Sequence, residues 1–511
     1  MTQVRLRDLD GDTDYPELVF GVVAAVGTPW KEAFEPYLLG GLTTRGYTGA
    51  ETISVSSLLK DIPYLTEPYP PDYPEYERVT KLMNRGNELR KTSGRLEALA
   101  LMVAARIKGL RPKATDGALS GRAFIVHQLK TPEEVLWLRR TYGDAFHLVG
   151  LYSPHADRQK YLVEKKGMTE RDAKDLIARD EGEEDPHGQQ VRKTFHLADV
   201  FIEATSGNTA RVQEQVDRFL DLLFGRAIIS PTKDEYGMYL AHAVGLRSTD
   251  LSRQVGAAVL NDEGDVLGLG PNEVPAAGGG QYWGEKGKPD HRDFKEGYDY
   301  NEVRKGEIAS EIIQKLEQLR PSTGNAGKAY AEAARDELTK LLDSTPIAHL
   351  IEFGRAVHAE MEALLSATRR GVAVNGARLY TTVFPCHNCA KHIVGAGIGQ
   401  VFYIEPYAKS LAPVMHRDSI WFTDYGEPPG AQESSAQVAA GAPRKWVRFS
   451  PFLGVAPRRF AALFMRPRMK AEGGAVSTTP IGLRLRGPML SLREREALAA
   501  RAGEDLKSSP S

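Results

Sequence analysis

The sequence predicts an α/β protein of two domains followed by a polar tail. A chain of 511 residues is too long for one hydrophobic core, so at least two domains are expected. In residues 1–225, short apolar runs alternate with helical patterns, which predicts a parallel sheet covered by helices. Residues 226–470 show a second alternation of strands and helices. Residues 471–511 contain paired glycines and an Arg/Glu-rich end, and we expect a flexible tail there, made of a linker, a short helix and a frayed end.

The overall composition argues against several classes of protein. The 66 basic and 67 acidic residues leave a net charge of −1, so the chain lacks the basic field typical of nucleic-acid-binding proteins. Two cysteines cannot build a disulfide scaffold and fit a reducing compartment. The N-terminus lacks the apolar core of a signal peptide, and no apolar run reaches transmembrane length. We therefore expect a cytoplasmic protein without a membrane partner.

The first element is a buried strand that runs into a glycine-containing turn. Residues 17–28 read ELVFGVVAAVGT. The run resembles a phosphate-binding loop, which makes Gly21, Gly27 and Thr28 candidate nucleotide-binding residues. It departs from Gly-x4-Gly-Lys-Ser/Thr because the two glycines stand one residue too far apart and no lysine precedes Thr28. A plain turn between strand and helix stays an alternative, and we do not expect phosphoryl transfer.

The elements that follow support the same kind of domain. Residues 123–126 and 146–152 read as buried strands, and Thr131-Pro132-Glu133-Glu134 starts a helix. The polar stretch 158–190 resembles the lid of small P-loop kinases, and residues 196–224 resemble their C-terminal end. We interpret residues 1–225 as a P-loop nucleotide kinase-like domain that senses or binds a nucleotide.

A helix, a hairpin and an asparagine open the second domain. Residues 254–260 and 266–270 read as two strands joined by Asp262-Glu263-Gly264. This order resembles the front half of the deoxycytidylate deaminases, in which the asparagine at the position of Asn272 contacts the sugar. The alternatives are a turn-capping role for Asn272 and, for Arg253, either a phosphate contact or a surface position.

The most specific motif lies further on. It reads His358-Ala359-Glu360 and then Pro385-Cys386-His387-Asn388-Cys389, and it contains both cysteines of the chain. A His-x-Glu followed by Pro-Cys-x-x-Cys is the signature of zinc-dependent nucleobase deaminases. The alternative for Cys-x-x-Cys is a redox dithiol or a pair of buried thiols, but neither explains the histidine and the glutamate.

These residue types match the chemistry of a catalytic zinc site. Such a site uses three protein ligands and one water, and His358, Cys386 and Cys389 supply the ligands for one zinc ion per chain. Zinc lowers the pKa of its bound water from about 16 to about 7, which makes hydroxide available at neutral pH. Glu360 would move protons to the ring and to the leaving amine. The spacing predicts His358 and Glu360 in the first turn of one helix and the cysteines one turn apart on another.

Later stretches extend the resemblance. Residues 405–410, 415–419 and 449–459 are similar to the bacterial anti-phage dCTP deaminases, so the resemblance covers roughly residues 15–465. That family joins a kinase-like domain to a cytidine-deaminase-like α/β/α domain. The resemblance implies conversion of dCTP to dUTP, or of dCMP to dUMP, which depletes a pool that a phage needs. It also implies a homo-oligomer, and control of the N-terminal domain by a regulatory nucleotide or by an inhibitory RNA or protein.

About eighty residues separate Asn272 from the metal histidine. We expect residues 281–350 to form an insert, with helices around 307–319 and 326–342, that covers the pocket or makes an oligomer contact.

Three other functions stay open at this point. A nucleic-acid deaminase predicts a basic strip with stacking aromatics. A nucleotide kinase needs the lysine that the loop lacks. A nucleotide-responsive protein with an inactive deaminase domain is at odds with an intact Glu360.

Overall fold

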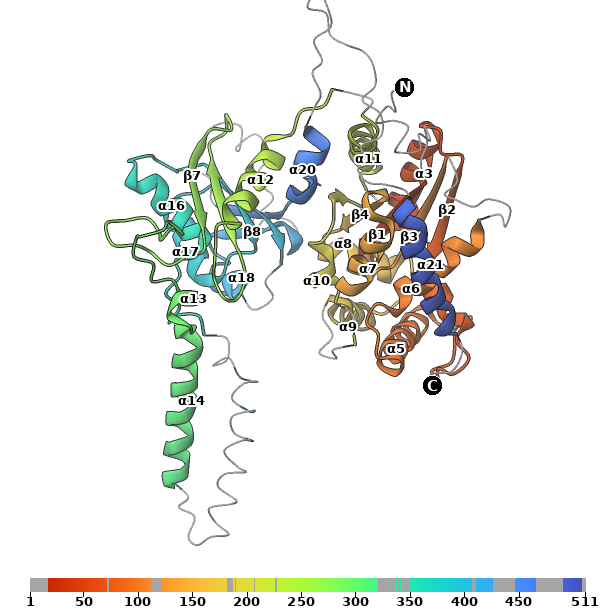
Figure 1. The fold of residues 1–511 in the computed structure, drawn as a ribbon, viewed down its shortest axis with the longest axis horizontal. Helices are drawn as coiled ribbons and strands as arrows, with labels where there is room; N and C mark the ends of the chain where they lie inside the picture. The colour runs from red at the N-terminus through yellow and green to blue at the C-terminus, as the bar shows by residue number, and fades with distance from the viewer. Residues whose placement is uncertain are drawn as a thin grey trace, which may run out of the picture. The chain divides into compact units, whose positions relative to one another are not determined.

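The computed structural model describes residues 17–70, 73–111, 121–181, 187–188, 190–205, 207–225, 228–319, 337, 341, 345, 350–406, 410–425, 446–465 and 490–507. The chain divides into two compact units (Figure 1). The first consists of Met1–Tyr239, Phe422–Glu433 and Ser450–Ser511, and the second of Leu240–Trp421 and Ser434–Phe449. The boundary thus lies inside helix α12 (Lys233–Gly245) rather than at residue 225, where the sequence analysis placed it.

The first unit is built on a six-stranded sheet in the order β12-β5-β4-β1-β3-β2. Strands β1 to β5 run parallel to their neighbours, and β12 pairs antiparallel with β5. The strand bounds are β1 Leu18–Ala24, β2 Gly49–Ser54, β3 Arg122–His127, β4 Phe146–Tyr152, β5 Val200–Glu203 and β12 Gly454–Val455. The expected parallel sheet is confirmed. Its assignment to a P-loop kinase stays a prediction.

Helices cover this sheet because parallel strands carry apolar side chains on both faces. All seven residues of β1 are buried. Leu18, Phe20 and Val22 belong to one core cluster with residues of α3 (Glu35–Thr43) and α11 (Thr209–Phe224). The remaining helices before α12 are α2 Trp30–Ala33, α4 Val55–Leu58, α5 Glu75–Ser93, α6 Ala98–Leu110, α7 Pro132–Tyr142, α8 His155–Glu164, α9 Glu170–Glu181 and α10 Val191–Phe195, with 3-10 turns η1 Leu59–Asp61 and η2 Gly143–Ala145.

The C-terminal part of the chain returns to the first unit, which differs from the expected domain bounds. Strand β12 and helix α20 (Pro457–Phe464) were assigned to the second domain by sequence, yet β12 completes the first sheet. Helix α21 (Leu490–Asp505) matches the expected short helix, but it packs on α6 and is therefore not part of a flexible tail (Figure 1). The sequence did not predict this packing because the helix is rich in charged residues, and one of its contacts is a buried charge cluster.

That cluster joins residues far apart in the sequence. The Arg111 guanidinium pairs with the carboxylates of Glu17 and Glu496, and the Tyr142 hydroxyl donates a hydrogen bond of 2.9 Å to Glu496. All four side chains are largely buried. Buried charges are stable only when they are paired, so the cluster ties α21 to the first unit.

The second unit holds a sheet in the order β10-β11-β9-β8-β6-β7. Its strands are β6 Gly256–Leu260, β7 Val266–Pro271, β8 Arg378–Val383, β9 Gln400–Glu405, β10 Ile420–Phe422 and β11 Val447–Pro451. The β6–β7 hairpin and the β6–β8 pair are antiparallel, whereas β8 and β9 are parallel. The helices of this unit after α12 are α13 Asp293–Glu296, α14 Tyr300–Leu319, α16 Ala359–Arg369, α17 His387–Gly395 and α18 Ala412–Met415, and η4 Thr423–Tyr425 follows β10.

Two glycines allow helix α16 to pack closely against the β6–β7 hairpin. A Cβ at Gly268 would lie 2.1 Å from the Ala363 carbonyl oxygen, and one at Gly270 would lie 2.3 Å from the Ala363 nitrogen. Only glycine permits this approach of backbone to backbone. The contact fixes the start of α16, which carries the metal-site histidine and glutamate, relative to the sheet.

The insert is described in part. Helix α14 matches the expected helix around 307–319 but begins earlier, at Tyr300. The expected helix over 326–342 lies almost wholly outside the described residues. The Asn301 side-chain amide donates a hydrogen bond to the Leu350 carbonyl at 2.8 Å, so the start of α14 lies beside the end of the insert. Among the described residues, no helix combines the length and apolar character needed to cross a membrane. The expected cytoplasmic location stays a prediction.

Candidate metal centre and active site

Two helix N-termini bring the three predicted metal ligands together. His358 is the N-cap of α16 and Cys386 is the N-cap of α17, and both have extended backbone conformations. Cys389 lies in the first turn of α17, and its N–H donates to the Cys386 sulfur at 3.5 Å. The predicted helix starts are therefore confirmed, with His358 immediately before the first turn rather than inside it.

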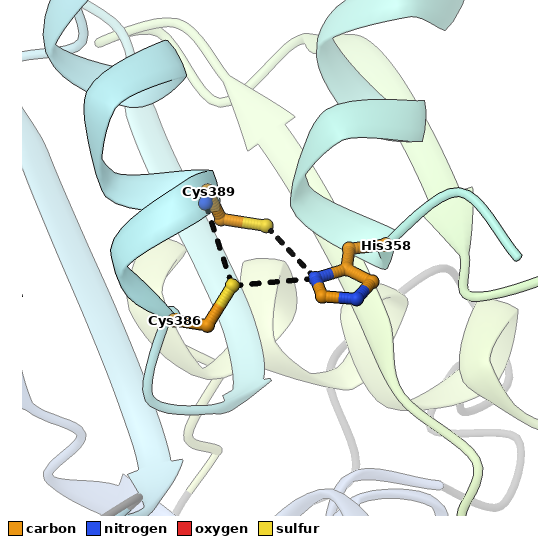
Figure 2. Close-up of side chains that lie close together, drawn as sticks. All are labelled: His358, Cys386 and Cys389. Atoms are coloured by element: carbon orange, nitrogen blue, oxygen red, sulfur yellow. Dashed lines mark hydrogen bonds between the residues drawn. The ribbon is translucent and has the colours of Figure 1, made fainter. Parts of the chain in front are cut away.

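The three donor atoms converge on one point. The His358 Nδ1 lies 3.3 Å from the sulfur of Cys386 and 3.3 Å from that of Cys389 (Figure 2). The three atoms lie within 4.8 Å of one another, and this is the only such metal-ligating group that the described residues contain. With zinc bonds of about 2.3 Å to sulfur and about 2.0–2.1 Å to nitrogen, tetrahedral N and S ligands stand roughly 3.5 Å apart. The geometry fits zinc.

The electrostatics of the group favour a cation. Hydrogen bonding by Cys389, and then by His358, lowers the pKa of the Cys386 thiol to about 4, so this sulfur is a thiolate at neutral pH. The hydrogen bond to Cys386, together with burial, raises the pKa of Cys389. The hydrogen bond with Cys386 also raises the pKa of His358 to about 9. Because cysteine ligands bind metals as thiolates and histidine as neutral imidazole, a cation bound here would displace protons from the group.

Glu360 lies beside the three ligands without belonging to them. Its side chain is buried, and one carboxylate oxygen is 3.5 Å from the Cys389 sulfur. Burial raises the pKa of Glu360, whereas the neighbouring His358 lowers it. A carboxyl group with a raised pKa suits a residue that accepts and returns protons.

These residues open onto a pocket of about 240 Å³. Its metal-site members are His358, Glu360 and Cys386. The other lining residues belong to the segment before β6, the end of β7, the insert, the segment between the insert and α16, the start of α16, and the end of β8. They are Asp250, Ser252, Arg253, Val255, Asn272, Asp293, Asp299, Asn301, Ile351, Gly354, Arg355, Ala356, Ala359, Val383 and Phe384. The pocket is therefore polar on the insert side and partly apolar beside the metal site.

Residues 231–405, which contain this pocket, match the family model described as the cytidine and deoxycytidylate deaminase zinc-binding region. This part of the chain is therefore similar to the zinc-binding region of these deaminases.

Several known proteins resemble parts of this chain. The ComE operon protein 2 of Bacillus subtilis (strain 168) is 45% identical over 62 residues, which is 11% of this chain and 33% of that protein. The deoxycytidylate deaminase of Enterobacteria phage T4 is 44% identical over 54 residues, 11% of this chain and 28% of that enzyme. The deoxycytidylate deaminase of Homo sapiens is 22% identical over 170 residues, 33% of this chain and 63% of that enzyme.

These matches are local. The chain spans about a third of the length of the B. subtilis and phage relatives. Among solved structures, dCMP deaminase from the cyanophage S-TIM5 in apo form shows 16% identity and a TM-score of 0.22, with 44% of this chain and 100% of that chain covered. A similarity this weak supports no further statement about this chain.

The donor set agrees with the family's metal. One imidazole nitrogen and two sulfurs are ligands that zinc prefers, and three protein ligands leave a coordination position for water or substrate. The deaminase domain is thus a zinc-binding one, with His358, Cys386 and Cys389 as the residues that would hold the ion. The histidine in the group also argues against a simple redox dithiol.

Asn272 lies in the pocket wall but already has partners. Its side-chain oxygen accepts from the Val255 N–H at 2.7 Å, and its Nδ2 donates to the Arg253 carbonyl at 2.9 Å. Its backbone carbonyl accepts from the Ser248 hydroxyl. Asn272 therefore fixes the turn before β6, as the turn-capping alternative holds, and its second Nδ2 hydrogen is the one left to reach a substrate.

Two arginines line the pocket, and the sequence analysis identified only one of them. Arg253 lines the pocket and pairs with Glu405 at 2.6 Å. Arg355, which sequence analysis missed, also lines it and pairs with Asp293 of the insert at 2.9 Å. The expected insert, residues 281–350, contributes Asp293, Asp299 and Asn301 to the lining of the pocket. The signal was available, since Arg355 stands three positions before His358.

The N-terminal candidates lie in the first unit. Gly27 has φ +85° and, with Thr28, lines a separate cavity at the end of β1. Gly21 is placed differently from the prediction, because it lies inside β1 rather than in the loop. A Cβ there would meet the Phe146 ring at 2.7 Å, so Gly21 is a packing residue and does not line that cavity.

Proposed function

We propose that the chain deaminates free deoxycytidine nucleotides, converting dCTP to dUTP or dCMP to dUMP with release of ammonia. The observation that carries this proposal is the position of the buried Glu360 carboxylate beside the converging His358, Cys386 and Cys389 donor atoms. The deaminase match of residues 231–405 supports the reaction class. The proposal that the substrate carries phosphate groups is based on the arginines of the pocket and on the resemblance of the sequence to dCTP deaminases.

The reaction exchanges the C4 amine of cytosine for an oxygen from water. Zinc held by the three ligands would supply the positive charge that makes water acidic enough to attack. Glu360 takes a proton from the water and gives it to ring N3; it then takes the proton of the hydroxyl added at C4 and delivers it to the amine, which leaves as ammonia while C4 becomes a carbonyl. Burial raises the pKa of Glu360, which suits a carboxylate that accepts and returns protons.

The pocket supports a single nucleotide rather than a nucleic-acid strand. Its volume of about 240 Å³ suits one base with its sugar, and insert residues form one wall. Among the described residues that line it, Arg253 and Arg355 are the only arginines or lysines, so the pocket lacks the basic strip that a nucleic-acid strand requires. These features argue against the nucleic-acid deaminase alternative.

Two arginines would receive the phosphates. Arg253 and Arg355 are the cationic side chains among the lining residues, and each is held by a carboxylate in the absence of substrate. A phosphate can replace that carboxylate because guanidinium groups bind both anions in the same planar geometry. We infer that Arg355, supplied next to the insert, contributes to phosphate recognition.

The test is ammonia release by the zinc-loaded protein, offered dCTP, dCMP, CTP, deoxycytidine and a cytosine-containing oligonucleotide. Release from dCTP or dCMP alone supports the proposal, and release only from the oligonucleotide contradicts it. Arg355→Gln should raise KM for the nucleotide without changing the rate on deoxycytidine. Arg304→Gln, a pair-forming arginine of the insert outside the pocket, is the matched control.

The proposal also includes a biological role for the deamination. We infer from the resemblance to anti-phage dCTP deaminases that the activity depletes the dCTP pool during infection. Cells that express the chain should restrict phage plating, and cells that express Glu360→Ala should not. Equal restriction by both would contradict the antiviral role of the reaction. The expected homo-oligomer, and control by an RNA or protein, stay predictions.

A further inference from the structure

A second cavity lies in the first unit, away from the deaminase motif in sequence. It has a volume of about 230 Å³ and is lined by residues between Ala24 and Lys166. Three adjacent strands contribute their carboxyl ends: β1 with Ala24, β2 with the following Val55, and β3 with His127. In open α/β sheets, ligands bind at this edge, where the strand order reverses direction. The order β2-β3-β1-β4-β5 reverses beside β1.

The β1 loop at this edge is already occupied by the protein's own carboxylate. The Asp180 side chain, fully buried on α9, accepts a hydrogen bond from the Val26 N–H at 2.7 Å and pairs with the Lys130 amine at 2.8 Å. Lys130 also donates to the Ala24 carbonyl at 3.1 Å. The cation and the amide that a phosphate would use at this loop are therefore neutralised, and a ligand's anionic group must lie elsewhere.

The interior of the cavity suits an aromatic ring. Apolar side chains of α5, α6 and α8 line it, including Leu82, Leu99 and Leu162. One wall is the stacked pair of Trp30 and His127, whose ring centroids lie 3.5 Å apart with planes inclined by 19°. Burial lowers the pKa of His127 well below its usual range, so the wall is neutral at physiological pH. Aromatic walls of this kind bind nucleobases by stacking.

Polar groups for specific recognition are present as well. The Thr28 hydroxyl is buried and has no hydrogen-bond partner within the described structure. Gln128 has φ +76°, the only positive φ among the described non-glycine residues. Its side-chain oxygen accepts from the Ser56 N–H at 3.3 Å, which fixes the residue in the cavity wall. Backbone strain of this kind clusters at ligand sites.

Two exposed lysines stand at the cavity without a carboxylate partner. Lys31 and Lys166 both line it, and neither pairs with an acidic residue within the described ranges. The Lys166 amine lies 5.4 Å from the Tyr161 ring centroid. The other cations of the lining are paired, Lys130 with Asp180, Arg90 with Glu134 and Arg78 with Glu75.

We propose that this cavity binds a nucleoside phosphate, with the base against the Trp30–His127 pair and the phosphates on Lys31 and Lys166. The phosphates thus lie away from the β1 loop, which Asp180 closes. The site is separate from the deaminase pocket, and the proposal holds whether or not the deaminase function does. It gives the first unit a ligand of its own and excludes phosphoryl transfer at the loop.

The test measures binding of labelled dTTP and dGTP, neither of which contains cytosine, to the full zinc-loaded chain by equilibrium dialysis. At least one should bind, and Lys31→Gln with Lys166→Gln should raise its Kd at least about tenfold by removing both phosphate contacts. The matched control is Lys165→Gln, the exposed neighbour of Lys166 that does not line the cavity. Its Kd should equal that of the unchanged chain.

Other outcomes overturn the proposal. They are the absence of binding by both nucleotides at millimolar concentration, an unchanged Kd in the double lysine variant, and loss of binding in Arg253→Gln instead. Competition by inorganic triphosphate at the same concentration as the nucleotide would also contradict it, because the base would then contribute nothing. In the same assay, Asp180→Asn should strengthen triphosphate binding by freeing Lys130, and no change would show that Asp180 does not close the loop.

Discussion

The Nδ1 of His358 lies 3.3 Å from the sulfur of Cys386, although 28 positions separate the two residues. Each residue caps a different helix; α16 packs on strands β6 and β7 of the sheet, and α17 contacts α16. The metal centre therefore depends on the two helix starts and on the sheet contacts that position them. The predictions below test these parts separately.

Removing the Glu360 carboxylate should stop deamination and leave the zinc site intact. Glu360→Ala should lower kcat on dCTP or dCMP by at least about 10²-fold, the range for loss of a general acid–base residue. Zinc content by atomic emission should remain near one per chain, because Glu360 is not in the ligand group. Activity close to that of the unchanged protein would remove Glu360 from the mechanism.

Replacing a thiolate ligand should remove the metal. Cys386→Ser substitutes a harder, neutral donor for the sulfur whose low pKa makes it the thiolate of the group. We expect zinc stoichiometry to fall well below one per chain. His387→Gln is the matched control, since His387 is adjacent in sequence and lies outside the ligand group. Equal zinc content in the two variants would show that Cys386 is no ligand.

Adding one methyl group under helix α16 should disturb the site from a distance. In Gly270→Ala the Cβ would lie 2.3 Å from the Ala363 nitrogen and 2.4 Å from the Ala359 carbonyl oxygen, so the helix must shift. We expect a loss of about 1–3 kcal/mol in the free energy of unfolding and a lower kcat. Gly306→Ala in α14, where a Cβ has open space, should leave both unchanged or raise stability slightly. Matching results for the two variants would contradict this account of the α16 contact.

Helix α21 should stabilise the first unit through Glu496. Glu496→Ala leaves the buried Arg111 guanidinium with Glu17 alone and removes the acceptor of the Tyr142 hydroxyl. Breaking a buried charge pair costs roughly 3–5 kcal/mol, so denaturant unfolding of this unit should shift to lower concentration. Glu504→Ala, an exposed position of the same helix, is the control. A midpoint that stays unchanged in Glu496→Ala would mean that α21 packs without this cluster.

The local sequence was sufficient for the metal centre and for the type of fold. His358, Glu360, Cys386 and Cys389 were identified because their residue types and spacing reflect bonding requirements of zinc, which are nearly independent of the rest of the chain. Strands β1, β3 and β4 of the first unit and β6 and β7 of the second were recognised because apolar runs signal burial wherever they occur, whereas β2, β10, β11 and β12 were not predicted. These signals are short-range, so one sequence contains them in full.

The tertiary structure alone decided how distant segments meet. Helix α21 joins the first unit, and Asp180 reaches the β1 loop across 154 positions of sequence. These contacts depend on long-range packing and on the pairing of buried charges. Neither the packing nor the charge pairing leaves a periodic pattern in the sequence. Gly21 shows the same limit, because its glycine is required by the Phe146 ring of a neighbouring strand rather than by a loop. The sequence by itself thus determined which chemistry the chain carries, and the packing decided which residues surround it.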